Sequence, residues 1–248
     1  MSVKSAERTL QIFEAFAQAG EPLLLSDLAR RIAIPVSACH GLVRTLKARG
    51  YLYELGPRRG YYPTLRWLEK ARLIAAHDPV AQRVAPFLER LCEETGETVL
   101  LGRQLGDRVL YLLVVESRNS IRYSAQVGDL KPMHSSSAGK TLLGSMSKPA
   151  RDALLATTRL ARLTPNTITR REDLQKDLAR GHARGWYATR GENVADVHAI
   201  AMPVTLGGQV HAVVVAGPAP RMDAALNAQV KRLQKTCRAI EAAQREAS

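Results

Sequence analysis

Leu23–Leu52 constrains the fold more than any other stretch, because it predicts two short helices separated by a tight turn. In the first helix, Leu28 and Ile32 repeat at the i, i+4 spacing that places both side chains on one face. Ser26 precedes them, and its hydroxyl can accept from the free N–H groups of a first turn, so we predict it as the N-cap. The helix should end before Pro35, because the residue before a proline is pushed out of the helical region.

The second predicted helix runs from Val36 to Ala48 and ends near Gly50, a residue type favoured just past a helix end. Its predicted buried face carries Val36, Cys39, Leu42, Val43 and Leu46. Its polar face carries Ser37, His40, Gly41, Arg44 and Lys47. Two helices with a tight turn and a polar outer face on the second form the arrangement that reads the major groove of DNA. The same spacing also fits an antiparallel helix pair in an ordinary bundle.

The residues after this helix favour the DNA-reading interpretation. Residues 51–55 are typical of a strand, residues 56–60 of a turn, and Tyr61 and Tyr62 of a returning strand. Such a hairpin is the wing of a winged helix-turn-helix. Arg58 and Arg59 at its tip are predicted to contact phosphates or the narrow minor groove, although arginines in an exposed turn are usually just solvated. We predict that Ser26, the polar face of the second helix and these arginines contact double-stranded operator DNA.

Net charge agrees with a polyanionic partner. The chain has 36 Lys and Arg against 23 Asp and Glu, which gives a formal net charge of +13. Residues 1–76 have 12 basic and 6 acidic side chains, net +6, whereas the longer remainder has a net charge of +7. The N-terminal part is therefore the more basic per residue, which supports the helix-turn-helix prediction without proving it.

Cysteine usage and hydropathy indicate a cytoplasmic protein. Cys39, Cys92 and Cys237 are odd in number, far apart and in no C-x-x-C pair, which argues against a disulfide framework or a zinc site. The polar N-terminus begins a predicted helix and does not resemble a signal peptide. No apolar run reaches membrane-spanning length, so we expect no membrane partner, and the histidines show no metal-ligand spacing.

The chain is long enough for two domains. We predict a winged helix-turn-helix domain over residues 1–63, opened by a helix over residues 5–19 with Ser5 as its N-cap. A linker helix follows within residues 64–78, and a second domain covers residues 79–248. The apolar side chains of the linker helix are spread around more than one face, so they need partners on several sides. We predict that the chain self-associates through this helix, because a palindromic operator is bound by two paired DNA-binding domains.

The second domain alternates predicted helices and strands. Helices are expected over residues 79–95, 135–146, 149–157, 171–185 and 223–243, and strands over residues 98–105, 108–116, 121–126, 186–189, 200–206 and 210–216. Residues 128–133 are expected to form a loop. Hairpin links such as Gly207-Gly208 favour an antiparallel sheet, so we predict a mixed α/β (α+β) domain with helices covering the sheet.

Two motifs suggest catalysis, and both lack their companions. Ala138-Gly-Lys-Thr141 resembles a phosphate-binding loop, but that motif needs a glycine where this chain has His134. Ser137 and Lys140 fit the S-x-x-K pattern of serine acyl enzymes, yet no K-T-G triad follows. We therefore expect neither an enzyme nor a bound cofactor. Ser135-Ser136-Ser137 instead marks a helix N-terminus, where free N–H groups and the dipole favour an anion, or where the serines simply cap the helix.

The residues resemble those of the IclR-type bacterial transcription regulators over nearly the whole chain. In the first domain the resemblance rests on residues 26–31, 34–35, 37, 40–42 and 46–52. In the second it rests on residues 94–98, Gly128, 132–134, 138–140, 163–169, 184–187, 200–204 and 217–218. It implies an N-terminal winged helix-turn-helix, a linker helix and a C-terminal effector domain related to GAF-type ligand sensors. It also implies homodimers, often paired into dimers of dimers, whose operator affinity changes when a small organic molecule binds.

Departures from the family pattern concern both predicted sites. Val36 and Gly41 stand where members often have a basic or polar residue, so base contacts are expected to be few. Family members that bind small keto acids resemble one another in having polar residues at four positions. In this chain those positions align with Thr189, Ala199, Val214 and Ala216. We therefore expect an acid with an apolar body, either aromatic or short and branched. The predicted effector contacts are these four residues together with Tyr123, His134, Ser135, Ser136, Ser137 and Ala138.

The sequence thus predicts a one-component transcription regulator controlled by a small organic acid. Two other classes stay open: an acyl enzyme that uses Ser137 and Lys140, and a metabolite-binding module without DNA function. The apolar positions of the predicted effector site also have a plainer reading, in which Ala199, Val214 and Ala216 belong to the core and the ligand binds elsewhere.

Overall fold

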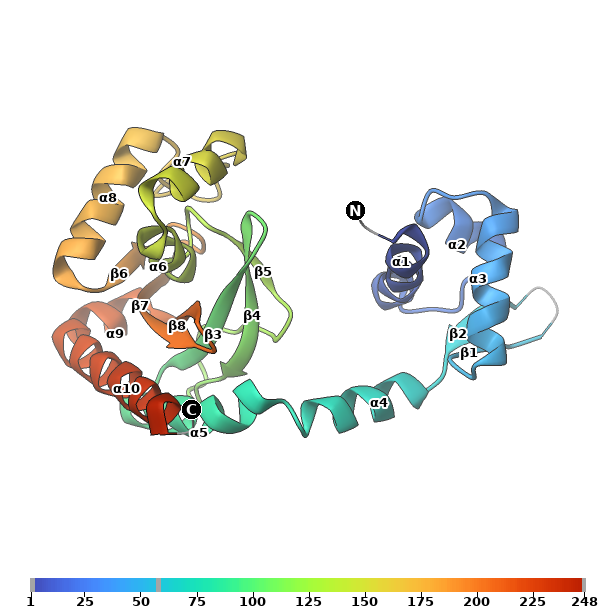
Figure 1. Ribbon diagram of the computed structural model, residues 1–248, viewed down its shortest axis with the longest axis horizontal. Helices are drawn as coiled ribbons and strands as arrows, with labels where there is room; N and C mark the ends of the chain where they lie inside the picture. The colour runs from blue at the N-terminus through green and yellow to red at the C-terminus, as the bar shows by residue number, and fades with distance from the viewer. Residues whose placement is uncertain (1–2, 57–58, 247–248) are drawn as a thin grey trace. The chain divides into compact units, whose positions relative to one another are not determined.

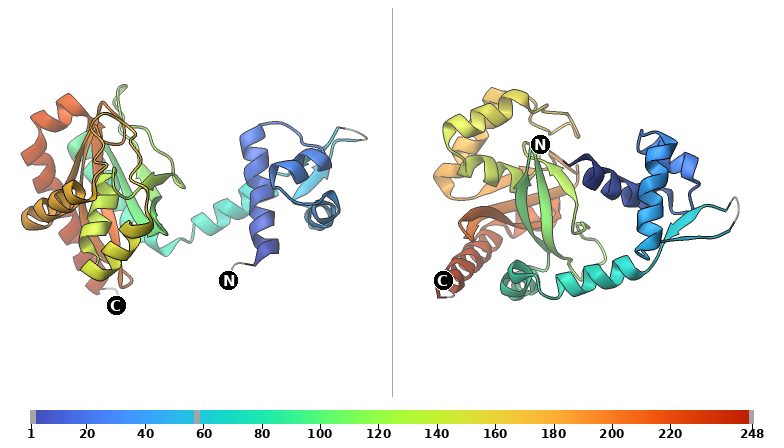
Figure 2. Two further views of the ribbon diagram at one scale, coloured as in Figure 1. Left: turned by 90° about the horizontal axis from the view of Figure 1, so that it is seen from above. Right: turned by 45° about the vertical axis from the view of Figure 1, so that its right-hand side comes forward.

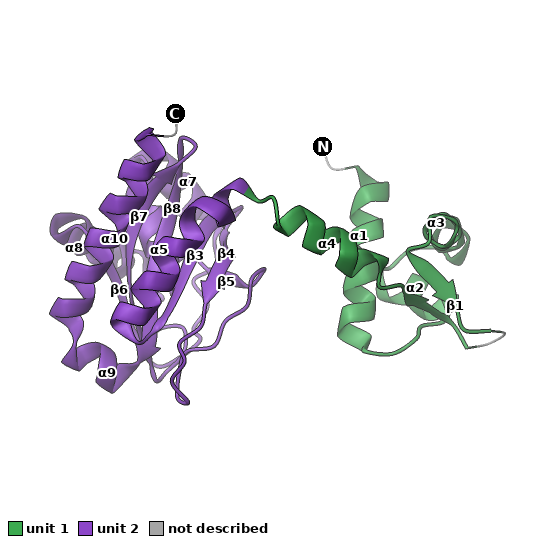
Figure 3. Cartoon of the chain, turned by 90° about the horizontal axis from the view of Figure 1, so that it is seen from below, with its two compact units in different colours: residues 1–78 green, residues 79–248 purple. Residues whose placement is uncertain are grey.

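The computed structural model describes residues 3–56 and 59–246. The chain divides into two compact units, residues 1–78 and 79–248, which are coloured separately in Figure 3. Each unit has its own hydrophobic core and is described by itself. None of the helices in the described part of the chain combines the length and hydropathy of a membrane-spanning segment.

The first unit is a three-helix core with a two-stranded hairpin and a further helix (Figure 1). Its elements are α1 (Lys4–Ala19), α2 (Leu25–Arg31), α3 (Val36–Ala48), β1 (Leu52–Glu54), β2 (Tyr61–Pro63) and α4 (Arg66–Ala75). The two strands pair antiparallel, with Tyr53 opposite Tyr62. Ile12, Phe16 and Leu28 are buried against Val43 and other apolar residues of α3. This architecture confirms the predicted winged helix-turn-helix.

Both predicted serine caps are wrong. Helix α1 begins at Lys4, and α2 begins at Leu25, so Ser5 and Ser26 lie inside their helices and cap neither. For α2 the reason is a β-bridge: Leu23 exchanges backbone hydrogen bonds with Tyr61, which holds the chain extended up to Leu24. The helix can then start immediately after that bridge, one residue before the serine.

The buried face of α3 is also narrower than predicted. Cys39, Val43 and Leu46 are buried at the i, i+4, i+7 spacing of a single stripe. Val36, predicted to belong to this face, is 50% exposed because it lies in the first turn, before the stripe begins. Leu42 is half-buried at the edge of the stripe.

The second unit is a six-stranded antiparallel sheet with helices on both faces (Figures 1 and 2). The strand order is β5-β4-β3-β8-β7-β6. The strands are β3 (Thr98–Leu105), β4 (Arg108–Val115), β5 (Leu130–Pro132), β6 (Tyr187–Arg190), β7 (Val197–Leu206) and β8 (Gln209–Pro218). The helices are α5 (Pro79–Thr95), α6 (Ser137–Ser145), α7 (Lys148–Thr157), α8 (Arg171–Arg184), α9 (Ala219–Ala224) and α10 (Leu226–Glu246). The predicted α+β class is confirmed.

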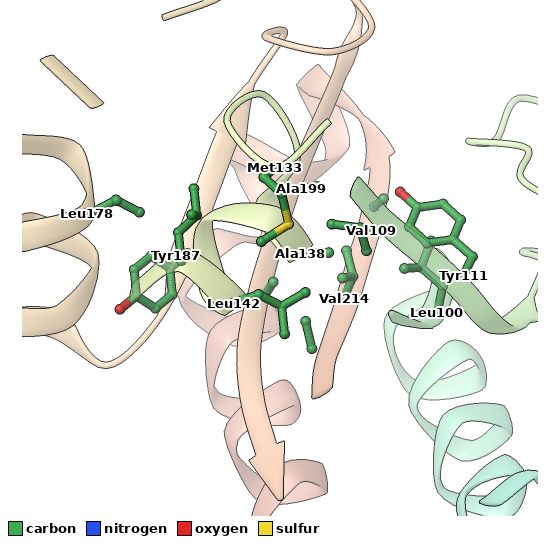
Figure 4. Packing of buried hydrophobic residues seen from close by; sticks show 14 of the residues in the cluster. Leu100, Val109, Tyr111, Met133, Ala138, Leu142, Leu178, Tyr187, Ala199 and Val214 are labelled. Carbon is green, nitrogen blue, oxygen red and sulfur yellow. The ribbon is translucent and has the colours of Figure 1, made fainter. Parts of the chain in front are cut away.

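Side-chain alternation along the strands divides the core into two layers. On one face Val99, Leu101 and Val215 pack against α5 and α10. On the other face Leu100 and Val214 pack against α6, α7 and α8, as Figure 4 shows for the central residues of this layer. The second layer contains the side chains predicted to bind an effector.

Two predicted elements of this unit are wrong. Residues 121–126 form no strand, because β4 pairs instead with β5, in the segment expected to be a loop. Ile121 is consequently 74% exposed. The C-terminal helix predicted as one element is split into α9 and α10 at Ala225, whose φ of −109° and ψ of 8° interrupt the helical backbone.

Candidate functional site

The polar face of α3 is open to solvent in the first unit. Ser37, His40 and Arg44 are exposed at spacings of three and four residues, so they lie on one side of the helix. Gly41 is half-buried between them, and a Cβ added there would meet no atom within 4 Å. This face can therefore approach another molecule closely, as a recognition helix approaches base edges.

Lys47 has a more specific role than the sequence suggested. Its ammonium group donates a hydrogen bond to the Glu54 carboxylate on β1, and this bond raises the pKa of Lys47. The side chain thus ties the end of α3 to the hairpin. Ser26 is exposed near the start of α2, and Arg59 is exposed in the hairpin turn, whereas Arg58 lies outside the described residues.

Replacing glycine with alanine should have opposite effects on stability at two positions of this unit. Gly41→Ala should stabilise the unit by about 0.5–1 kcal/mol, because alanine favours the helix and the added methyl group has free space. Gly60→Ala should destabilise it, because Gly60 has a φ of +82° and its new Cβ would lie 2.6 Å from the Leu23 carbonyl oxygen. Thermal unfolding followed by Trp67 fluorescence in a Trp186→Phe background measures both. Equal melting temperatures for the two variants would contradict this reading of the backbone.

The second candidate site is a small cavity between the sheet and the N-terminus of α6. Its volume is about 30 Å³. The lining residues are Tyr111, Tyr123, Ser136, Ser137, Thr189, Asn193, Val194, Val197, Ala199, Val214 and Ala216. Seven residues predicted from the sequence therefore lie together around one cavity. Tyr111, Asn193, Val194 and Val197 were missed, because β4, the loop before β7 and the start of β7 carry no motif that marks them.

The helix N-terminus at this cavity retains free donors. Ser136 is the N-cap: its hydroxyl accepts from the Gly139 N–H at 3.1 Å and donates to the Pro132 carbonyl at 2.7 Å. Among the described residues, no acceptor pairs with the backbone N–H groups of Ser137 and Ala138. These two groups, together with the helix dipole, favour an anion at this end of the cavity.

Three predicted contacts lie outside the cavity lining. His134 is buried, and its Nε2 donates to the Ala161 carbonyl at 3.0 Å, while burial lowers its pKa so that the ring is neutral. Ser135 accepts a hydrogen bond at 3.2 Å from the Asn193 side chain, so it supports a lining residue instead of lining the cavity itself. Ala138 packs in the core beneath the sheet (Figure 4).

Close packing accounts for Gly139 in the segment that resembles a phosphate-binding loop. A Cβ at this position would overlap the backbone carbonyl of Met133, so the glycine allows α6 to pack directly on the preceding segment. Tyr187 has a similar relation to two other glycines, because its ring occupies the space that a Cβ at Gly144 on α6 or at Gly181 on α8 would need. These close approaches fix α6 against β6 and α8.

Lys140 explains the second half of the motif. Its side chain is fully buried, and its ammonium group lies 2.7 Å from carboxylate oxygens of both Asp177 and Glu192. It also donates to the Ala188 carbonyl at 3.3 Å. Among the described residues, the hydrogen-bond partners of the Lys140 ammonium group are Asp177, Ala188 and Glu192, and the Ser137 hydroxyl of the S-x-x-K pattern is not one of them.

The Lys140 cluster also anchors the segment that closes the cavity. Burial raises the pKa of Glu192, although the lysine opposes that effect. The Glu192 carbonyl accepts from the Thr167 hydroxyl at 2.7 Å, and the Gly191 carbonyl accepts from the Thr164 hydroxyl at 2.6 Å. The next residue, Asn193, lines the cavity. Among the described residues, no group of His, Cys, Asp or Glu side chains is arranged to hold a metal ion.

Comparison with protein families places both units in one group of proteins. The model of the IclR helix-turn-helix domain matches residues 5–56. The model described as bacterial transcriptional regulator IclR C-terminal matches residues 73–242, more than half of the chain.

Individual proteins give the same result. The HTH-type transcriptional regulator BhcR of Paracoccus denitrificans is 31% identical over 91% of this chain and 82% of its own length. The regulator XynR of Escherichia coli K12 is 27% identical over 82% of this chain and 80% of its own. Among solved structures, an IclR homologue of Microbacterium hydrocarbonoxydans complexed with 4-hydroxybenzoate has a TM-score of 0.81 and 27% identity, covering 98% of this chain and 100% of that one.

Proposed function

Because this chain belongs to the IclR family of bacterial transcriptional regulators, we propose that an organic acid with an apolar body, either aromatic or short and branched, controls its operator binding. The chain is a DNA-binding regulator with a C-terminal effector domain. What is proposed is the class of effector, its seat at the N-terminus of α6, the protein–DNA contacts and a dimeric state. The observation that carries the proposal is a cavity with free backbone donors at one end and alanine and valine on its wall.

The chemistry of the lining favours an aromatic acid over a small keto acid. Ala199, Val214 and Ala216 offer no hydrogen-bonding side-chain atoms, and an unpaired polar group of a buried ligand loses about 1–3 kcal/mol. A carboxylate can bind to the Ser137 and Ala138 N–H groups, while a ring contacts the apolar wall. The homologue solved with 4-hydroxybenzoate is consistent with such a ligand class in this fold.

Tyr111 and Tyr123 supply a polar group beside that apolar wall. Burial raises the pKa of the Tyr111 phenol, and the neighbouring Tyr123 acts in the same direction. Tyr111 therefore remains a neutral donor. A hydroxyl substituent on the ring of the effector would find a partner in this tyrosine pair.

The cavity must enlarge to bind such an acid. A volume of about 30 Å³ accommodates a single water molecule, far less than the ~300 Å³ typical of small-molecule pockets. The strands and α6 are fixed by the sheet and by close packing. Val194, which is 44% exposed, lies in the segment between β6 and β7 that has no regular structure, so we propose that this segment moves when the effector binds.

A panel of acids measured by thermal shift tests the effector proposal. Benzoate, 4-hydroxybenzoate and isobutyrate should raise the melting temperature of the full chain, and glyoxylate and pyruvate should not. Val214→Asp places a charge on the apolar wall and should remove the response, whereas Val210→Asp, at an exposed position of the same strand, should preserve it. Stabilisation by glyoxylate or pyruvate alone would show the proposed ligand class to be wrong.

On DNA, we propose that α3 lies in the major groove with Ser37, His40 and Arg44 toward the bases. Gly41 allows close approach, and Arg59 in the wing contacts the phosphate backbone. Ser26, at the start of α2, is placed to contact a phosphate. Such a regulator works in the bacterial cytoplasm, where the DNA lies, and it needs no catalytic activity.

We further propose a homodimer formed through α4. The start of this helix packs on its own unit, where Trp67 contacts the rings of Phe13 and Tyr51 with centroid distances of 4.2 and 4.8 Å. Its other apolar side chains are exposed, and Ile74 is the extreme case at 74%. A second copy of the chain would bury this face and pair two readers for a palindromic site.

Changing two residues of α4 tests the dimer. Leu73→Lys with Ile74→Lys should convert the protein to monomers, because two charges would face the apolar surface of the partner. Light scattering after size-exclusion chromatography measures the mass. Lys70→Gln on the same helix is the matched control and should leave the dimer intact. A mass unchanged by the double substitution would place the interface elsewhere.

A further inference from the structure

We propose that the effector domain has a second binding site, for a small anion with a carboxylate or phosphate group, in a cleft on the far side of β6 and β7 from the effector cavity. The cleft has a volume of about 300 Å³ and lies between α8, β6 and the junction of α9 with α10. That volume is at the lower end of the range for small-molecule sites. Residues lining the cleft include Arg184, Trp186, Arg190, His198 and Leu226.

Each acidic residue of the cleft already has a partner, among them Arg180, which lies 3.2 Å from Asp177. Asp177 and Glu192 both pair with Lys140. Asp223 lies 3.0 Å from the Nδ1 atom of His198. Within residues 79–246, by contrast, neither Arg184 nor Arg190 forms an ion pair with a carboxylate, so two guanidinium groups are available to a ligand.

Arg184 is held in position for such a role. Its Nε donates to the Trp186 carbonyl at 2.7 Å, and its guanidinium carbon lies 3.8 Å from the centre of the Trp186 ring. The other guanidinium N–H groups remain free to donate. Because the group is already fixed by stacking, it loses little conformational freedom when an anion binds.

Charges of both signs act on Arg184. Partial burial lowers its pKa, the Asp177 carboxylate opposes that effect, and the nearby guanidinium groups of Arg180 and Arg190 reinforce it. Leu226, the first residue of α10, also lines the cleft. The positive end of a long helix therefore borders the same space and favours an anion there.

The cleft shares structure with the effector cavity. Thr189 and Ala199 are paired in register on β6 and β7, and both residues line the two spaces. Glu192 lines the cleft, while the next residue, Asn193, lines the cavity. The existence of the anion site does not rest on the proposed effector, but its influence on DNA binding requires the regulator function.

Fluorescence of Trp186 reports directly on the cleft. The chain has two tryptophans, so a Trp67→Phe variant leaves Trp186 as the sole indole. Sodium phosphate and sodium succinate are titrated separately at constant ionic strength, with sodium chloride as the reference. At least one of these anions should change the Trp186 fluorescence in a saturable way. The anion that saturates at the lower concentration identifies the preferred anionic group.

Arg190→Gln supplies the decisive variant, because it leaves Arg184, the arginine stacked on the indole, unchanged. It should weaken binding of the anion by about tenfold, because one charge-assisted hydrogen bond is lost. Arg159→Gln removes an exposed arginine after α7 and should leave the titration unchanged. The site would be overturned if phosphate and succinate changed the fluorescence no more than sodium chloride does. Equal affinities of the Arg190→Gln and Arg159→Gln proteins for the anion would overturn it as well.

Operator binding separates this site from the rest of the regulator. At constant ionic strength the saturating anion should change operator affinity by about threefold or more in the parent protein, and Arg190→Gln should remove that change. Saturable binding in the cleft with no change in operator affinity would overturn its regulatory role. An operator response equal in both proteins would place the anion elsewhere, for example on the DNA-binding surface.

Discussion

Replacing Lys140 with methionine should destabilise the effector domain by about 3–5 kcal/mol, a large share of the total stability of a typical domain. The lysine is fully buried, and its removal would leave the Glu192 carboxylate without a cation and Asp177 with only its exposed partner Arg180. An uncompensated buried charge is far more costly than a lost surface pair. Chemical denaturation of the full chain, followed by Trp186 fluorescence in the Trp67→Phe background, isolates the domain concerned.

Lys148→Met is the matched control for this experiment. Lys148 pairs with Asp152 at 3.0 Å on the exposed surface of α7, where an ion pair contributes at most about 1 kcal/mol. Adding Glu192→Gln to Lys140→Met should recover part of the loss, because the carboxylate left without a cation disappears. A Lys140→Met protein as stable as the Lys148→Met control would contradict the structural role of the cluster.

Replacing Arg44 with alanine should weaken binding to the preferred operator by about 1–3 kcal/mol, with a smaller loss on random DNA. The side chain is exposed on the polar face of α3, one turn from His40, where it can form a bidentate contact with guanine. Binding-site selection from genomic fragments would provide the operator, and fluorescence anisotropy would measure both affinities.

Arg44→Lys sharpens the test. Lysine preserves the charge but cannot donate two parallel hydrogen bonds to one base. Its affinity for random DNA should therefore match that of the parent protein, while its affinity for the operator should fall. Equal losses on both DNAs in the alanine variant would reduce Arg44 to a phosphate contact.

Local patterns in the sequence predict much of the fold. The bounds of α3, α5 and β3 coincide with those predicted, because each has a clear periodicity and a proline, glycine or polar turn at its ends. Ser26 fails as a cap because a β-bridge between Leu23 and Tyr61, distant in sequence, decides where α2 begins. Likewise, the alternating residues 121–126 can form a strand in isolation, but β4 pairs with β5 instead.

At the candidate effector site, too, local sequence patterns predict some residues, whereas contacts between residues far apart in the sequence are not predicted. Ser136 and Ser137 were predictable because helix N-termini have a local signature. The partners of Lys140 were not, because Asp177 and Glu192 follow it by 37 and 52 residues, and nothing in the sequence marks them as neighbours. Asn193 and Val194 line the cavity and directly follow Glu192, the residue that pairs with Lys140.

The close packing around α6 has a consequence for engineering this protein as a biosensor. Gly139 against Met133, and Gly144 against Tyr187, leave no space for added atoms, so α6, which borders the candidate effector cavity, has no room for larger residues at these two positions. The opposite wall differs, because Ala199, Val214 and Ala216 project from strands whose backbone pairing is independent of side-chain size. A library that varies these three positions should change the ligand selectivity of the proposed effector site while the sequence of α6 stays constant.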